Sequence, residues 1–268
     1  AEHARRGGEL ARAVPLYARA AMHAYVHNDF AACDRLAEQG VSCGASGQCL
    51  GELRALQATM LFWRGQHTEA IRTGYEAIAL LPAGGAEWCL AASYVITTAG
   101  ISMRLGSELP LVETCLTVEP APDAIAGYAR VLCMIVHMAV AVGFVPIGRR
   151  SLARLERLAP NPELADPLTR ASLHFARGWM SLMCGQDCFE SSLHYEQSLA
   201  AYHEMGDARH GLHARMHQAR AQAVCGMVNE ATAALESYLE QANKLWEPLL
   251  ASVIQSRLGE ALCRRALP

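Results

Sequence analysis

Glycines recur along this chain at nearly constant intervals, and this spacing restricts the possible folds more than any other feature. Successive glycines in the series lie 41, 37, 42 and 41 residues apart, and Asn28 precedes the first by 37 residues. The five are Gly65, Gly106, Gly143, Gly185 and Gly226. Self-similarity at a period of about 20–50 residues is typical of proteins that stack copies of one supersecondary unit. The sequence therefore predicts a repeat protein with units of about 40 residues.

The segments between these glycines have helical rather than strand-like patterns. Apolar residues recur at positions i, i+3, i+4 and i+7, and short groups of Gly, Pro, Asn or Asp separate the segments. The chain has no Asn-Gly turn and no run of strict apolar–polar alternation. Seven residues before four of the five glycines stands Ala or Gly, which would let two helices approach closely. We therefore expect an all-α protein built from helical hairpins.

The second unit shows the repeat most clearly, with Ala58, Gly65, Ala70, Ala77 and Pro82 at regular offsets. This pattern resembles the tetratricopeptide repeat family, and the resemblance implies a right-handed α-solenoid of about six hairpins with a terminal capping helix. On this basis, residues 1–268 form a single repeat domain. The predicted hairpins are 9–45, 47–82, 86–121, 123–160, 164–205 and 208–243, and the terminal helix is 248–266.

A narrower resemblance concerns the segment from Tyr195 to Leu199 and the following Gly206-Asp207 pair. It is similar to the C-terminal helical-repeat regions of large bacterial signalling ATPases and of serine/threonine kinases of the myxobacterial type. The resemblance implies a regulatory region of a larger bacterial signalling protein, and an intramolecular kinase or ATPase domain as one candidate partner. The start at Ala1 rather than Met fits the expectation of a fragment.

Charge and lysine content argue against two classes of function. The chain has 23 basic and 26 acidic residues, and it has no basic stripe of the kind that binds a nucleic-acid backbone. Lys244 is the only lysine, and it lies outside any glycine-rich phosphate-binding motif. A Gly-x-Ser-x-Gly motif is also missing. We therefore expect a protein without enzymatic activity and without a cofactor, and no binding to nucleic acid.

The ten cysteines do not form a spacing pattern typical of a secreted disulfide scaffold. Residues 1–30 lack the uninterrupted apolar run of a signal peptide. We therefore interpret the cysteines as small apolar residues in a reducing compartment, which favours the cytoplasm. Cys184 and Cys188 have i, i+4 spacing but flank a predicted turn, and Cys43 and Cys49 lie in a predicted loop. A metal or redox role is the less favoured interpretation of these cysteines.

A long apolar run extends from Val131 to Val142 and contains His137 as its only ionisable side chain. Its length approaches that of a membrane span. Gly143 and Pro146 follow where the repeat predicts a turn. We therefore expect a buried central helix and no membrane partner.

Histidines are grouped in two places along the chain. His210, His213 and His217 share one helical face, and His23 and His27 form an i, i+4 pair. Two histidines at such spacing can bind a metal, but neither group has a companion cysteine or a Glu-x-x-His partner. The favoured interpretation is a solvated or groove-facing stripe without a metal site.

The stacked first helices of such hairpins line a concave groove, which is the predicted binding surface. When the family's inward positions are carried over in register, nine residues are placed there. They are Glu52, Thr59, Ser93, Arg130, His137, Ser172, Trp179, His213 and Arg220. Their mix of charge and aromatic surface suits a protein or peptide partner with acidic and apolar side chains. In particular, we expect Arg130, His137 and Arg220 to face one shared concavity.

Three alternatives remain open from the sequence alone. The aromatic residues Phe62, Trp63, Phe175 and Trp179 could instead fill the space between helices. The repeat could sense a small-molecule effector, which an enclosed cavity of a few hundred Å³ would favour. It could also form oligomers through an exposed apolar face of the terminal helix. That face would comprise Leu249, Leu250, Val253, Ile254, Leu258 and Leu262.

Overall fold

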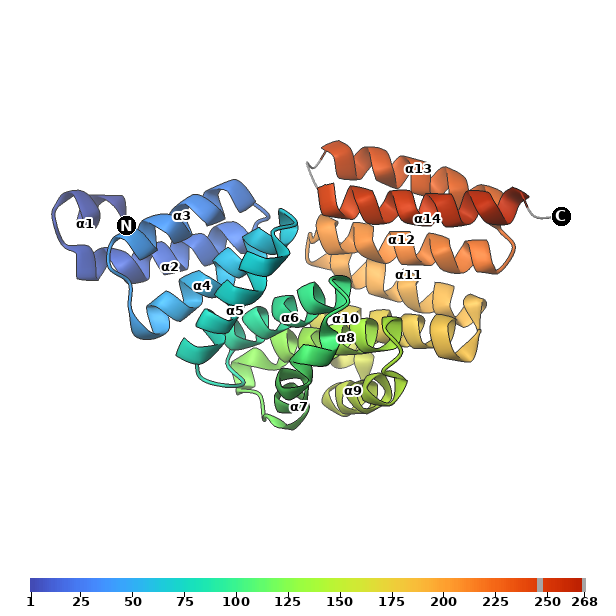
Figure 1. Cartoon of the computed structure of the whole chain (residues 1–268), viewed down its shortest axis with the longest axis horizontal. Coiled ribbons are helices and arrows are strands. Elements are labelled where there is room, and N and C mark those ends of the chain that lie inside the picture. Colours follow the sequence, from blue (N-terminus) through green and yellow to red (C-terminus); the bar gives the residue numbers. More distant parts are fainter. Residues whose placement is uncertain (245–247, 267–268) are drawn as a thin grey trace. The chain divides into compact units, whose positions relative to one another are not determined.

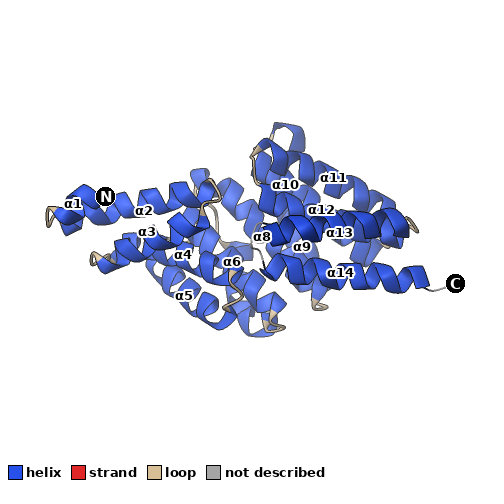
Figure 2. Cartoon of the chain, turned by 90° about the horizontal axis from the view of Figure 1, so that it is seen from above, coloured by secondary structure: helices blue, strands red, loops and turns tan. Residues whose placement is uncertain are grey.

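The structure is a computed structural model that describes residues 1–244 and 248–266, and its regular elements there are all helical (Figure 2). Within these residues the α-helices are α1 (Glu2–Arg6), α2 (Leu10–Val26), α3 (Phe30–Ser42), α4 (Gly47–Trp63), α5 (His67–Leu80), α6 (Ala86–Ile101), α7 (Leu109–Thr117), α8 (Ile125–Ala141), α9 (Val145–Leu158), α10 (Pro167–Met180), α11 (Cys188–Glu204), α12 (Ala208–Val224), α13 (Val228–Lys244) and α14 (Pro248–Ala266). The prediction of an all-α protein is confirmed. The helices pack as consecutive antiparallel pairs, as the hairpin pattern predicts.

The chain divides into two compact units, residues 1–131 and 132–268, and the boundary lies within α8. In the first unit, α2 packs on α3, and α4 packs on α5 (Figure 1). The first helices of successive hairpins are also in contact, because α4 packs on both α2 and α6. In the second unit, helices α10 to α14 each pack on the next one along the chain, and α12 also contacts α14. This sequential packing is consistent with a helical repeat.

The core of the first unit depends on small side chains. Ala18, Ala21 and Ala37 are buried against Leu53 and Leu56, so α2, α3 and α4 can approach closely. Gly74 shows how close the approach of α5 to α6 is. A Cβ atom added at Gly74 would lie 2.4 Å from the Cγ2 atom of Val95. The small residues of the repeat pattern therefore serve helix packing.

The second unit uses aspartate caps to begin its helices. The side chains of Asp166, Asp187 and Asp207 each accept a hydrogen bond from the backbone amide three residues later. These bonds satisfy amides that have no partner within the helix. Leu212, Leu235, Leu250, Ile254 and their neighbours then form a shared core of α12, α13 and α14. Most of the apolar face of the terminal helix is thus covered within the unit, and Leu262 remains 37% exposed.

The turns within the hairpins share one backbone motif. Asn28, Gly65, Gly143 and Gly226 have positive φ angles of 59°, 74°, 91° and 91°. At each of them, the amide of the following residue donates a hydrogen bond to a carbonyl five residues back. This arrangement is the Schellman motif, which ends a helix with one residue in the left-handed region. The repeated glycine is therefore explained at three of its five predicted positions.

At the other two positions the predicted turn residue is wrong. The left-handed residues are Met103 and Gln186, with φ angles of 57° and 56°, rather than Gly106 and Gly185. Gly106 lies in a short 3-10 turn, Leu105–Glu108, and Gly185 ends a π-helical turn, Ser181–Gly185. The glycine spacing located these hairpins correctly but placed the turn within them incorrectly. Side chains other than glycine can occupy this backbone conformation at a modest energetic cost.

The cysteine prediction also needs correction. Cys188 of α11 and Cys225, which follows α12, form a disulfide with 5.6 Å between their Cα atoms. Five of the other eight cysteines are buried, as expected for small apolar residues. Spacing along the chain gave no sign of the disulfide, because its two cysteines are 37 residues apart and meet only when α11 packs on α12.

The apolar run around α8 is long and apolar enough to cross a membrane, judged by length and composition alone. Pro122–Ala141 has a mean hydropathy of 1.7 in its best window, and 67% of that window is buried in the structure. The core helix of a soluble protein passes the same test, so this result is weak evidence for a membrane span.

Candidate functional site

Two clusters of aromatic and charged side chains stand out, one in each unit. The first, which we call the Arg130 cluster, comprises Tyr25, Trp63, Tyr94 and Arg130. The Arg130 guanidinium donates hydrogen bonds to the hydroxyls of Tyr25 at 3.4 Å and Tyr94 at 3.3 Å, and it lies 5.5 Å from the centre of the Tyr94 ring. The indole of Trp63 donates to the same Tyr94 hydroxyl at 3.2 Å. Four helices, α2, α4, α6 and α8, thus each supply one side chain.

Local packing explains why these four side chains meet. They lie on the first helices of consecutive hairpins, and in this unit α2, α4 and α6 contact one another in sequence. Tyr94 is buried at 4% exposure, and this burial raises the pKa of its hydroxyl well above the ordinary value. The phenol therefore stays neutral, and its oxygen can accept hydrogen bonds from both Trp63 and Arg130. Arg130 itself is half-buried.

The second cluster, which we call the histidine cluster, comprises His137, Trp179, Tyr195, His213 and His217. The ring centroids of His137 lie 4.5 Å from Trp179, 5.6 Å from His213 and 5.1 Å from His217. Tyr195 stacks on His217 at 5.6 Å. Because α8, α10, α11 and α12 each contribute, these rings come together only through tertiary packing.

Several polar atoms of the histidine cluster are buried without a hydrogen-bond partner among the described residues. They are Nδ1 of His137, both ring nitrogens of His217, Nε1 of Trp179 and the hydroxyl of Tyr195. A buried polar group without a partner costs about 1–3 kcal/mol. Burial, followed by the proximity of His213, lowers the pKa of His137 and of His217 well below the ordinary value. Both imidazoles are therefore neutral near pH 7.

Two arginines and one carboxylate lie at the edge of the histidine cluster. The Arg220 guanidinium lies 5.5 Å from the centre of the Trp179 ring and donates to Glu260 at 3.2 Å. Arg257 donates to the same carboxylate at 3.2 Å. Burial and Arg220 lower the pKa of Arg257, while the two arginines lower the pKa of Glu260 despite its burial. Arg264 also approaches this carboxylate, at 3.7 Å, so three cations share one anion at this edge.

The nine predicted groove residues are distributed between the two units. His137, Trp179 and His213 meet in the histidine cluster, with Arg220 at its edge, whereas Arg130 belongs to the other cluster. Thr59, Ser93 and Ser172 are almost fully buried, and the hydroxyls of Thr59 and Ser93 bond to carbonyls of their own helices. Burial raises the pKa of Glu52, which is bonded to Gln48. A groove shared by Arg130, His137 and Arg220 stays a prediction.

Most of the aromatic candidates are buried between helices, which is the alternative to a place on the groove surface. Phe62, Phe175 and Trp179 are 5%, 1% and 2% exposed, so they fill space between helices, while Trp63 is half-buried. The predicted histidine face is only partly brought together. His210 lies apart from the cluster and pairs with Asp207 at 2.7 Å.

Sequence reasoning missed Tyr25, Tyr94, Tyr195, Arg257 and Glu260. These residues stand within the predicted helices, where nothing in their spacing separates them from other surface or core positions. The burial of His137, in contrast, could be predicted, because His137 is the single ionisable side chain of a long apolar run.

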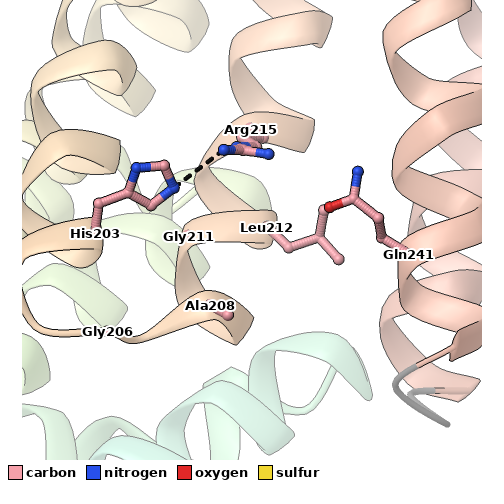
Figure 3. Close-up of a pocket in the computed structure, with 7 residues that line it drawn as sticks. All are labelled: His203, Gly206, Ala208, Gly211, Leu212, Arg215 and Gln241. Atoms are coloured by element: carbon pink, nitrogen blue, oxygen red, sulfur yellow. Dashed lines mark hydrogen bonds between the residues drawn. The ribbon is translucent and has the colours of Figure 1, made fainter.

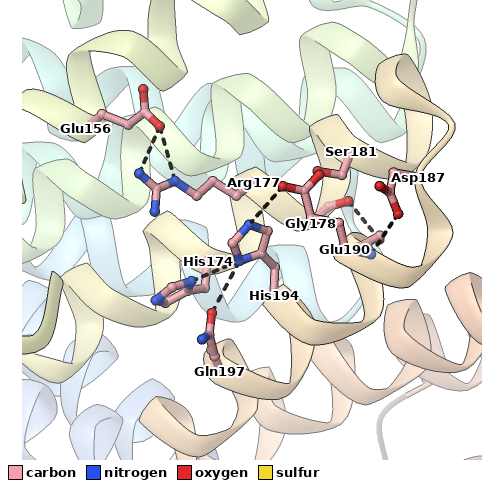
Figure 4. Close-up of polar contacts among 10 residues, drawn as sticks. Glu156, His174, Arg177, Gly178, Ser181, Asp187, Glu190, His194 and Gln197 are labelled. Atoms are coloured by element: carbon pink, nitrogen blue, oxygen red, sulfur yellow. Dashed lines mark hydrogen bonds and ion pairs between the residues drawn. The ribbon is translucent and has the colours of Figure 1, made fainter.

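Two of the open hollows in the second unit have polar side chains in their walls. One, of about 270 Å³, lies among α11, α12 and α13, where Arg215 donates to Nε2 of His203 at 3.0 Å near Gln241 (Figure 3). The other, of about 380 Å³, lies beside α9, α10 and α11. Its polar wall includes Arg177, which donates twice to Glu156, and His194, whose Nδ1 lies 3.2 Å from Nδ1 of His174 (Figure 4).

In comparisons with known proteins, no protein-family model and no curated protein matches this chain.

Proposed function

We propose that this chain is a non-catalytic protein-interaction module, arranged as a right-handed solenoid of the tetratricopeptide type, that binds an acidic protein or peptide partner. It would serve as the regulatory repeat region of a larger bacterial signalling protein in the cytoplasm. The sequential packing of antiparallel helix pairs supports this proposal, because stacked hairpins present an extended surface of side chains to which a partner can bind.

The Arg130 cluster is the observation that carries the proposal. Tyr25 and Tyr94 accept hydrogen bonds from Arg130, and Trp63 fixes the Tyr94 hydroxyl from the other side. The guanidinium is therefore held in one place before any partner arrives, which reduces the entropy lost on binding. Arginine, tyrosine and tryptophan are also the side chains most often found at the energetic centres of interfaces. A carboxylate with an apolar neighbour is the complementary ligand.

The test is selection of peptides from a random displayed library against the whole chain, followed by titration of the selected peptides by fluorescence anisotropy. We expect enrichment of Asp and Glu beside apolar residues. Arg130→Ala should weaken binding about 10- to 100-fold, as removal of an interfacial arginine typically does. Arg19→Ala, an exposed arginine of α2, is the matched control and should bind normally. Equal binding by both variants would refute the proposal.

A second candidate function is sensing of a small polar effector, with the open hollow beside α9, α10 and α11 as its candidate site. Its volume of about 380 Å³ lies within the range of ligand sites, and Arg177, Ser181, Glu190 and His194 line it. A thermal-shift screen of small polar metabolites tests this function. A hit should lose its effect in Arg177→Ala and keep it in Arg130→Ala.

A further inference from the structure

Three histidines of the second unit place ligand atoms unusually close together. One nitrogen each of His137, His213 and His217 can be chosen such that all three lie within 4.8 Å of one another. For any three atoms spaced in this way, some point lies within about 2.8 Å of every one of them, whereas zinc–nitrogen bonds measure about 2.0–2.1 Å. Each ring has to move by less than 1 Å to reach bonding distance. Such a movement is small compared with a change of rotamer.

An independent observation points into the same space. His137 and His217 are 7% and 1% exposed, and three of their ring nitrogens have no hydrogen-bond partner among the described residues. An imidazole buried in this way retains an unused acceptor nitrogen, which is the group that binds a metal ion. Packing alone gives no reason for an imidazole here, since a leucine of similar volume would avoid the unsatisfied nitrogens.

We propose that His137, His213 and His217 form a binding site for a divalent transition metal, with Zn²⁺ as the preferred ion. Neutral imidazoles are strong ligands for Zn²⁺, and a set of three histidines leaves a fourth coordination position open. The ion would connect α8 to α12 within the second unit. This proposal is independent of the proposed interaction function, which depends on the Arg130 cluster.

The charges around the three histidines indicate what occupies the fourth position. Arg220 and Arg257 both pair with Glu260, and Arg264 lies 3.7 Å from the same carboxylate. A divalent cation next to this excess positive charge is unfavourable unless a negative ligand accompanies it. We therefore expect an anion at the fourth position, either hydroxide or a carboxylate. Trp179 and Tyr195 offer an indole N–H and a phenol O–H in the same cluster for its outer oxygen atoms.

The test uses the full chain and the metal ion alone. The exposed pair His23 and His27, whose rings stack at 4.1 Å, could bind metal at i, i+4 spacing and is first replaced by glutamine. In this background, titration with Zn²⁺ followed by mass spectrometry of the native complex should give one ion per chain. Co²⁺ should give the intense visible absorption of a tetrahedral site. Stoichiometry near zero, or an absorption spectrum of hydrated Co²⁺, would overturn the proposal.

Two variants locate the site. His213→Gln changes a half-buried ligand and should lower Zn²⁺ affinity by at least about 100-fold, since loss of even an outer-shell partner costs 10- to 100-fold. His174→Gln, in the separate pair with His194, should leave affinity unchanged. If His213→Gln does not fold, the side-chain nitrogen signals of His137, His213 and His217 in the unsubstituted chain decide by nuclear magnetic resonance. Zn²⁺-dependent shifts of all three support the site, and shifts confined to other histidines refute it.

Discussion

The imidazole of His137 on α8 lies almost perpendicular to that of His217 on α12, with 5.1 Å between ring centroids and 85° between ring planes. Both rings are buried, and neither nitrogen of His217 has a hydrogen-bond partner among the residues that the structure describes. The two rings are therefore well packed, but ring nitrogens of this contact lack hydrogen-bond partners among the described residues. Substitutions at this contact separate the two effects.

His217→Leu should stabilise the metal-free chain by about 1 kcal/mol, because it removes a buried polar group while keeping most of the packed volume. The measurement is urea denaturation in the presence of a chelator. Phe175→Ala serves as the comparison, since it opens a cavity beside the same rings and should destabilise the chain by about 3–5 kcal/mol. A clear loss of stability in His217→Leu would show that the imidazole has partners that satisfy it.

Gly74→Ala should destabilise the first unit by about 1–3 kcal/mol. The added methyl group would lie 2.4 Å from Cγ2 of Val95, and a β-branched side chain has little freedom to move away. Gly259→Ala in α14 is the matched control, because nothing lies within 4 Å of its added Cβ. There alanine should stabilise the helix by up to about 1 kcal/mol. Thermal unfolding of both variants measures the difference, and shifts of the same sign would contradict the packing argument.

Met103→Gly tests the turn that the glycine spacing misplaced. Met103 has a φ angle of 57° and is 76% exposed, so glycine there relieves backbone strain without loss of packing. We expect a gain of up to about 1 kcal/mol in the free energy of unfolding. Gly65→Ala imposes the opposite change at the equivalent turn and should cost a similar amount. The interpretation fails if Met103→Gly destabilises the chain as much as Gly65→Ala does.

In protein prepared under oxidising conditions, reduction of the Cys188–Cys225 disulfide should lower the free energy of unfolding by about 4 kcal/mol. This value is the loss of loop-closure entropy that the disulfide imposes on the unfolded chain for a loop of this length. Melting curves with and without dithiothreitol measure the change, and a thiol count before reduction establishes that the bond is present. The double variant Cys188→Ser/Cys225→Ser should not respond to reductant. A melting temperature that is the same in both redox states would argue against a stabilising bond.

Mild acid should weaken the second unit through His174. Burial lowers the pKa of His174 to about 4 from the ordinary value of 6.5, with further contributions from His194, Arg177 and Arg170. Between these two pH values the unfolded chain binds more protons than the folded chain does. The stabilising contribution is therefore complete above pH 6.5 and is lost as the pH falls towards 4.

His174→Gln removes this proton binding, so its stability should fall less steeply between pH 6.5 and 4 than that of the unsubstituted chain. Urea denaturation at a series of pH values measures both slopes. Parallel curves for His174→Gln and the unsubstituted chain would show that His174 is not responsible.

Local sequence determined much of this protein. Helical periodicity and the absence of strand patterns predict an all-α chain, and small residues such as Ala58 mark where helices approach closely. These features depend on neighbours three to seven residues away, so the sequence displays them directly. The glycine period predicts paired helices for the same reason, although it misplaces two turns.

Tertiary structure alone decided the contacts that the function proposals use. The meeting of His137 with His217 and of Arg130 with Tyr25 joins residues from different helices. Their encounter depends on the rotation and offset of each helix pair, which the period of a repeat leaves free. Sequence spacing therefore indicates that such side chains are buried, and packing decides which of them lie side by side.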